Sequence, residues 1–124
     1  MSKDKCYSIN SYYQVEKLIN LKKNKRKVLI LYIKYYLVKG LGIDWLHTFI
    51  LLVKKNYHNH KIKFYIDSGN DYGLSIQIFK ENIDYLKIKS NNEIIKKIRQ
   101  IAKKNKVLLN PDFNIVEVSK IKKI

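Results

Sequence analysis

Cysteine, proline and glycine are scarce in this 124-residue chain, and each shortage excludes a kind of protein. The single cysteine, Cys6, rules out an internal disulfide framework and a cysteine-based zinc finger. With one proline and four glycines there is no linker rich in these residues, so we expect residues 1–124 to form a single domain. No apolar run approaches the roughly 20 residues of a membrane-spanning helix, and no apolar stretch of a secretory signal follows Met1–Lys5. We therefore expect a reduced, cytoplasmic protein without a membrane span.

Acidic residues are also few. The chain has 10 Asp and Glu against 26 Lys and Arg, which gives a formal net charge of +16. A charge of this size and sign predicts at least weak, salt-dependent binding to nucleic acid. The candidate contacts for nucleic acid are the basic residues of one short run, namely Lys22, Lys23, Lys25, Arg26 and Lys27.

The same charge has a second explanation in the coding sequence. Lys, Ile, Asn and Tyr have AT-rich codons and account for 65 of the 124 residues, whereas alanine occurs once and arginine twice. Arginine makes bidentate contacts to phosphates and base edges, so its scarcity argues against a sequence-specific reader of nucleic acid. From the sequence, the lysine-rich composition is either a functional adaptation to a polyanionic partner or a product of an AT-rich coding bias.

Hydrophobic residues make up 46% of the chain, which is enough for a packed core. Their spacing predicts helices over 11–24, 43–56 and 74–82 and from Ser90 onward, and strands over 28–33, 61–66, 85–89 and 106–109. Residues 115–118 are a short fifth strand candidate, and 35–39 either extend the first strand or form a loop. We expect 1–10 to be a polar N-terminal lead and 119–124 a frayed tail.

Strands and helices thus alternate along the chain. This order is typical of right-handed βαβ units and therefore of a parallel sheet. The continuous apolar run Val28–Ile33 is typical of a strand that is buried on both faces. We predict an α/β fold, a small three-layer domain with about four mainly parallel strands and flanking helices.

The loop at 67–73 is the leading candidate for a ligand site. In an open parallel sheet, ligands bind beyond the carboxyl ends of the strands, and this loop follows a predicted strand and opens a predicted helix. Its carboxylates, hydroxyl and glycines suit a phosphoryl group, or Mg²⁺ held by Asp67 and Asp71. Alternatively, Asn70 or Asp71 caps the helix and the glycines serve the turn. The candidate ligand-binding residues of this loop are Asp67, Ser68, Gly69, Asn70, Asp71 and Gly73.

Two other loops are expected at the same edge of the sheet. Gly40 and Gly42 precede a predicted helix, but Trp45 stands where a dinucleotide-binding loop has its third glycine, so we expect no such cofactor. Ser90 begins a predicted capping box that Glu93 completes three residues later. Gly40, Gly42 and Ser90 complete the set of candidate ligand-binding residues.

The sequence Asp67-Ser68-Gly69 resembles a motif of the anti-sigma-antagonist (STAS) domains, in which an Asp-Ser pair at the end of a strand opens a helix. The order of strand, turn and helix over 28–53 and again over 64–102 is similar to that of the family. The resemblance implies a regulatory domain that switches between protein partners, with Ser68 as the residue that is phosphorylated.

No residues in the sequence form an enzyme constellation. Cys6 has no obvious base beside it, and no serine stands in a G-x-S-x-G elbow. We therefore expect no catalytic residue, metal or cofactor. The leading hypothesis is a non-enzymatic binding or regulatory module with a protein partner or a second copy of itself. The alternatives are a basic nucleic-acid-associated protein and, third, a small enzyme or phosphoryl-ligand binder that uses the 67–73 loop.

Overall fold

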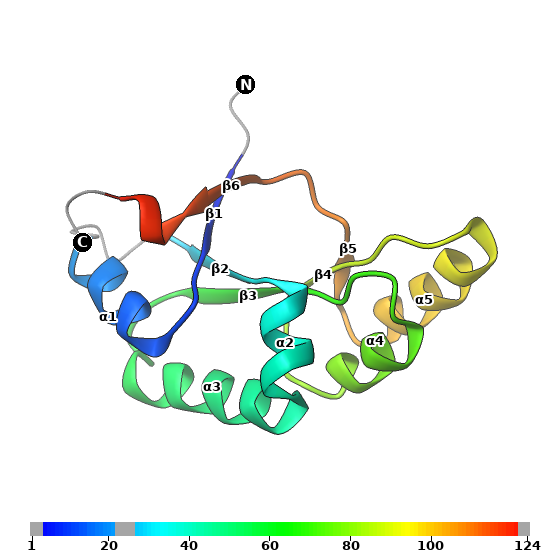
Figure 1. The fold of residues 1–124 in the computed structure, drawn as a ribbon, viewed down its shortest axis with the longest axis horizontal. Helices are drawn as coiled ribbons and strands as arrows, with labels where there is room; N and C mark the ends of the chain where they lie inside the picture. The colour runs from blue at the N-terminus through cyan, green and yellow to red at the C-terminus, as the bar shows by residue number, and fades with distance from the viewer. Residues whose placement is uncertain (1–3, 22–26, 122–124) are drawn as a thin grey trace.

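One parallel β-sheet lies at the centre of the structure, a computed structural model that describes residues 4–21 and 27–121. The strands in this part of the chain are β1 (Lys5–Ser8), β2 (Leu29–Ile33), β3 (Ile62–Asp67), β4 (Tyr85–Lys87), β5 (Leu108–Leu109) and β6 (Asn114–Glu117). Their spatial order is β5-β4-β3-β2-β1-β6, and every neighbouring pair is parallel (Figure 1).

The α-helices of the described chain all lie on one side of this sheet (Figure 1). They are α1 (Tyr12–Leu21), α2 (Tyr35–Leu41), α3 (Ile43–Asn56), α4 (Tyr72–Phe79) and α5 (Asn92–Lys104), and a 3₁₀ turn, η1 (Val118–Lys120), follows β6. From β1 to β5 each connection moves the chain one strand further in the same direction. Because crossovers between parallel strands are right-handed, such connections all fall on the same face.

The predicted α/β class with a parallel sheet is confirmed, with six strands in the described chain instead of about four. The helices form one layer and the sheet forms the next. The connection from β5 to β6 runs on the other side of the sheet from the helices (Figure 1). Phe113 of this connection packs against strand residues. This return from one edge of the sheet to the other runs opposite to the earlier steps, so a right-handed path places it on the opposite face.

Residues 5–8 form a strand inside the sheet, so the prediction of a polar N-terminal lead is wrong for them. This strand, β1, pairs with β2 on one side and with β6 on the other, with Tyr7 opposite Leu31 and Cys6 opposite Ile115. Four residues with lysine and serine at the ends show no alternation long enough to predict a strand. The two neighbouring strands supply the hydrogen bonds that hold it, and these are tertiary contacts.

Two other segments differ from the prediction. Tyr35–Leu41 is a helix, α2, and neither a loop nor an extension of the strand, because the Lys34 carbonyl accepts the N–H groups of Leu37 and Val38 and Val38 is buried in the core. The fifth strand candidate is observed one residue earlier, as β6. Residues 119 and 120 of the expected tail belong to η1, while 122–124 lie outside the described residues.

The larger core lies between the sheet and the helices. On β2, which is buried along its whole length as predicted, Leu29, Leu31 and Ile33 face the helices, whereas Ile30 and Tyr32 face the other way. Buried residues that complete the larger core include Phe64 and Ile66 from β3 and Val15, Leu18, Leu46, Phe49, Ile50, Ile78 and Ile98 from the helices.

We call the other surface of the sheet the helix-free face. It carries a second, smaller cluster of buried residues with two aromatic side chains packed against it. The buried members are Cys6, Ile30, Tyr32 and Tyr65, and the two side chains against them are Tyr85 and Phe113.

A proline scan of β1 distinguishes a strand from a polar lead. Tyr7→Pro removes a ladder N–H between two neighbouring strands, and we expect it to lower the free energy of unfolding by more than about 2 kcal/mol. Lys5→Pro, at the first strand position where proline is tolerated, is the matched control and should cost less. Urea denaturation measures both. If neither variant changes the denaturation midpoint, β1 does not belong to the folded sheet.

Candidate functional site

The 67–73 loop connects β3 to α4 at the carboxyl end of the sheet, as predicted, but its first carboxylate is already engaged. Asp67 Oδ1 accepts the Gly69 N–H at 2.8 Å. Asp67 Oδ2 accepts the hydroxyl of Tyr32 from the neighbouring strand at 2.7 Å. Both carboxylate oxygens therefore have donors from the protein itself, and the side chain serves the turn.

The second carboxylate of the loop caps a helix. Asp71 Oδ1 accepts the Leu74 N–H at 2.9 Å at the start of α4, and Oδ2 lies 3.2 Å from Lys39 Nζ. The helix N–H and then the lysine hold the pKa of Asp71 below its usual range, because both favour the charged form. Of the two predicted caps, Asp71 is the one observed, while Asn70 is exposed beside it.

The hydroxyl of Ser68 is enclosed in the protein. Ser68 is fully buried; its Oγ donates to the Lys87 carbonyl at 3.0 Å and accepts from Ser75 Oγ at 2.8 Å. A protein kinase needs a hydroxyl that it can reach, so the role that the STAS resemblance implies for Ser68 does not agree with its position.

The remaining predicted ligand-binding residues are spread over three places. Gly69, with φ of +64°, makes the turn, and Gly73 lies in the first turn of α4. Gly40 lies inside α2, and Gly42, with φ of +97°, joins α2 to α3. Ser90 is exposed one residue before the cap of α5.

The predicted capping box of Ser90 and Glu93 is wrong: the cap is the next residue, and it is a single side-chain cap without the reciprocal bond of a box. Asn91 is the N-cap of α5, and its Oδ1 accepts the Ile94 N–H at 2.9 Å. Asparagine caps helices as well as serine does, so the neighbouring residue takes the role predicted for Ser90.

The candidate nucleic-acid run falls largely outside the described residues. This applies to Lys22, Lys23, Lys25 and Arg26; Lys27, the last of the run, is exposed just before β2.

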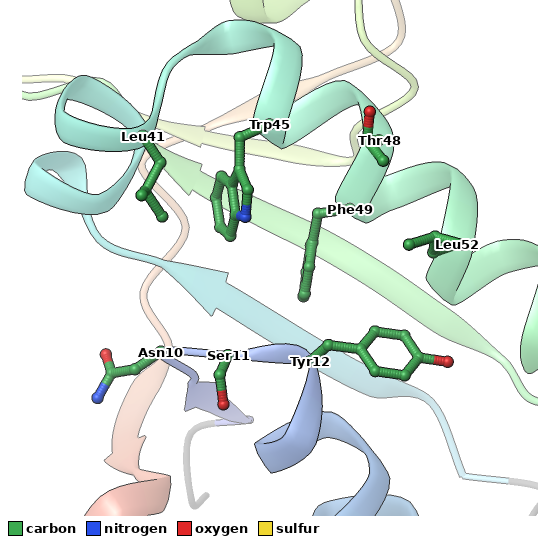
Figure 2. A pocket seen from close by; sticks show the side chains of 8 residues that line it. All are labelled: Asn10, Ser11, Tyr12, Leu41, Trp45, Thr48, Phe49 and Leu52. Carbon is green, nitrogen blue, oxygen red and sulfur yellow. The ribbon is translucent and has the colours of Figure 1, made fainter.

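A pocket that the sequence does not predict lies between the start of α1 and the helix pair α2–α3. Its volume is about 270 Å³. Figure 2 shows the Trp45 and Phe49 rings projecting from α3 toward the chain segment that opens α1. The lining residues are Asn10, Ser11, Tyr12, Leu41, Trp45, Thr48, Phe49 and Leu52.

Stacked and edge-on aromatic rings form the wall of this pocket. Trp45 stacks on Phe49 with ring centroids 5.2 Å apart, and Tyr12 meets Phe49 edge-on at 6.4 Å. Asn56 donates its side-chain N–H to the Tyr12 hydroxyl at 2.6 Å and so fixes this ring across the groove between α1 and α3. At the rim, Leu41 and Leu52 are 53% and 44% exposed, which leaves apolar surface free beside the pocket.

The polar groups at the mouth of the pocket serve the helix. Ser11 Oγ accepts the Gln14 N–H at 3.3 Å, and Gln14 Oε1 reaches back to accept the Asn10 N–H at 2.6 Å. This reciprocal arrangement satisfies donors at the start of α1. The pocket is therefore mainly apolar, and the Ser11 hydroxyl in its lining is already engaged with the helix.

No protein-family model matches the chain, and no curated protein matches it in sequence. The described residues contain no group of three or more His, Cys, Asp or Glu side chains that could hold a metal ion. Within the same residues no single helix is long and apolar enough to cross a membrane; α2 and α3 pass that test only as a pair, and they meet at a bend of 110°.

Replacing glycines tests whether the 67–73 loop is a turn or a ligand site. A Cβ on Gly69 would lie 2.9 Å from Tyr35 Cδ1 on a backbone with positive φ, so we expect Gly69→Ala to destabilise the fold by about 1–3 kcal/mol. Gly40→Ala is the control, since its Cβ meets nothing within 4 Å in a helix, and it should stabilise by about 0.5–1 kcal/mol. Thermal unfolding that is unchanged in Gly69→Ala would contradict a structural role.

The raised pKa of the Cys6 thiol predicts how the free energy of unfolding changes at alkaline pH. Burial on the helix-free face raises the pKa of the Cys6 thiol to about 11, against 9.0 for an ordinary thiol. Between these two pH values the unfolded chain has lost the proton that the folded chain keeps, so stability falls as pH rises.

The measurement is urea denaturation from pH 7 to pH 11. In Cys6→Ala the decline between about pH 9 and 11 should be less steep than in the wild type, by at most about 1.4 kcal/mol per pH unit. Burial also raises the pKa of Tyr32 and Tyr65, so part of the decline stays in the variant. Equal slopes for the two proteins would mean that the thiol is not kept protonated by folding.

Proposed function

We propose that the protein is a non-enzymatic binding module that receives an apolar side chain of a protein partner in the pocket between α1 and α3. The observation that carries this proposal is the aromatic-walled pocket with exposed leucines at its rim. An apolar pocket flanked by exposed apolar side chains is the usual form of a site that anchors a partner.

The lining of the pocket favours a side chain over a cofactor. Its volume, about 270 Å³, is at the lower end of the range of about 300–1,000 Å³ for drug-sized ligands. Its lining offers no charged residue that would fix a cofactor. A single large apolar side chain needs no such group, because shape and the exclusion of water are sufficient to hold it.

The net charge favours an acidic partner over a second copy of the chain. Two molecules that each carry +16 repel one another, whereas an acidic surface around the apolar anchor is attracted and steered toward the pocket. We therefore propose a partner segment that presents leucine-like side chains on an acidic background.

The enzyme hypothesis at the 67–73 loop has less support. Asp67 accepts hydrogen bonds from Gly69 and Tyr32, and Asp71 accepts one from Leu74, so both carboxylates already have a role in the fold. The nucleic-acid hypothesis draws its support from the helix-free face.

Trp45 is the only tryptophan of the chain and lines the pocket, so its fluorescence reports occupancy. The probe is a synthetic amphipathic helical peptide with leucines on one face and glutamates elsewhere. We expect a blue shift of Trp45 emission on titration, and Leu52→Asp should weaken binding by at least about tenfold, since it places a charge at the rim.

The matched control is Leu51→Asp. Leu51 is the neighbouring residue on α3, is similarly exposed and does not line the pocket, so this variant should bind as the wild type does. Equal losses in both variants, or no change in Trp45 emission, would contradict the pocket as the binding site. A peptide with lysine in place of glutamate should bind more weakly, and equal binding would contradict the acidic partner.

A further inference from the structure

The helix-free face carries a row of aromatic side chains. Tyr32, Tyr65 and Tyr85 occupy the same level on the three adjacent strands β2, β3 and β4, because Tyr32 is opposite Tyr65 and Tyr65 is opposite Tyr85. Phe113 lies over this row and meets Tyr65 and Tyr85 edge-on, with ring centroids 5.7 and 4.9 Å away. Leu108, opposite Tyr85 on β5, continues the row and is 59% exposed.

Lysines lie on both sides of the aromatic row. Lys63 is two residues before Tyr65 on β3, and its Nζ lies 5.8 Å from the centroid of the Tyr85 ring. Lys87 is two residues after Tyr85 on β4, and its Nζ lies 5.7 Å from the centroid of the Tyr32 ring. Because alternate residues of a strand share a face, these cations and rings belong to one surface.

Two acidic residues, Asp67 and Glu117, occupy strand positions on this face. Asp67 accepts the Tyr32 hydroxyl, and Glu117 forms a salt bridge with Lys34 at 2.9 Å. No ion pair of the described residues involves Lys63 or Lys87. A hydroxyl donor does not cancel the charge of a carboxylate, so Asp67 counts against the lysines. With Glu117 paired to Lys34, the two cations Lys63 and Lys87 still leave these strand positions with a net positive charge.

Coverage of the face is incomplete. Parallel sheets are ordinarily covered by helices on both faces, whereas among residues 4–21 and 27–121 the cover of this face consists of Phe113 and its short connection. Tyr32 and Tyr65 are buried beneath it, but Tyr85 and Phe113 keep part of their surface exposed. Two partly exposed rings between two lysines have the composition of a platform on which bases stack.

We propose that the helix-free face binds single-stranded nucleic acid, with bases stacked on Tyr85 and Phe113 and phosphates held by Lys63 and Lys87. A single strand exposes the base faces that such rings contact, and a duplex does not. Lysine contacts and stacking are tolerant of sequence, which agrees with a chain that has only two arginines. This proposal uses the face opposite the α1–α3 pocket and does not depend on the function proposed for that pocket.

The first test distinguishes binding at the helix-free face from nonspecific attraction to the net positive charge of the chain. Fluorescence anisotropy measures binding to labelled oligo(dT) and oligo(U) of about 15 nucleotides at about 50 to 200 mM salt. The double variant Lys63→Glu/Lys87→Glu should weaken binding by at least about tenfold and reduce the salt slope by about 1.4, as expected for two lost phosphate contacts to a single strand.

The matched control changes the charge by the same amount on the other side of the sheet. Lys96→Glu/Lys97→Glu alters two exposed lysines of α5 and should weaken binding by less than about threefold. Equal effects of the two double variants would overturn the proposal, because binding would then follow net charge alone. Binding of the wild type no tighter than that of a lysine-rich control protein of similar charge would overturn it as well.

The second test addresses stacking. Tyr85→Leu keeps an apolar side chain but removes the ring, so we expect at least about fivefold weaker binding with an unchanged salt slope. Tyr13→Leu is the control, since Tyr13 is an exposed tyrosine of α1 on the other side of the sheet and should have no effect. Near-ultraviolet circular dichroism confirms the fold of each variant. Equal effects of Tyr85→Leu and Tyr13→Leu would contradict the stacking platform, and the lysine pair tests the face independently if Tyr85→Leu fails to fold.

Discussion

The handedness of the crossovers is the constraint on which the rest of the structure depends. Each step from β1 to β5 moves in the same direction across the sheet, so every right-handed connection places its helix on the same face. The last step returns to the far edge and takes the other face with a connection that has no helix. The two faces of the sheet are consequently covered differently. One face packs against the helices, and the other, the helix-free face, is covered by Phe113 and its connection.

Long periodic segments could be predicted from the sequence because their pattern is local. The helix Ile43–Asn56 is observed with the predicted bounds, and the buried run of β2 lies where its apolar residues indicate. The strand β1 could not be predicted, because its four residues owe their conformation to pairing with β2 and β6. Elements held by distant partners leave no periodicity in their own sequence.

The candidate sites were likewise predictable where the signal is local and unpredictable where it depends on contacts between distant residues. The polar residues of the 67–73 loop are visible in the sequence, but their partners Tyr32, Lys39 and Lys87 come from other elements, so the contacts that engage these polar groups could not be predicted. The pocket unites residues 10–12 with residues 41–52. Trp45 and Leu52 belong to an amphipathic helix whose pattern does not distinguish a core contact from the wall of a cavity.

The short strand β5 limits what can join the sheet at its edge. Lys106 and Asn110 bracket it with left-handed backbone angles, φ of 57° and 47°, so the chain turns toward the sheet and away from it again within a few residues. Only two residues therefore offer backbone groups along that edge, which is too few to template the strand of another molecule. The β5 edge is therefore protected from pairing with the strand of another molecule, whereas the opposite edge, β6, offers four residues.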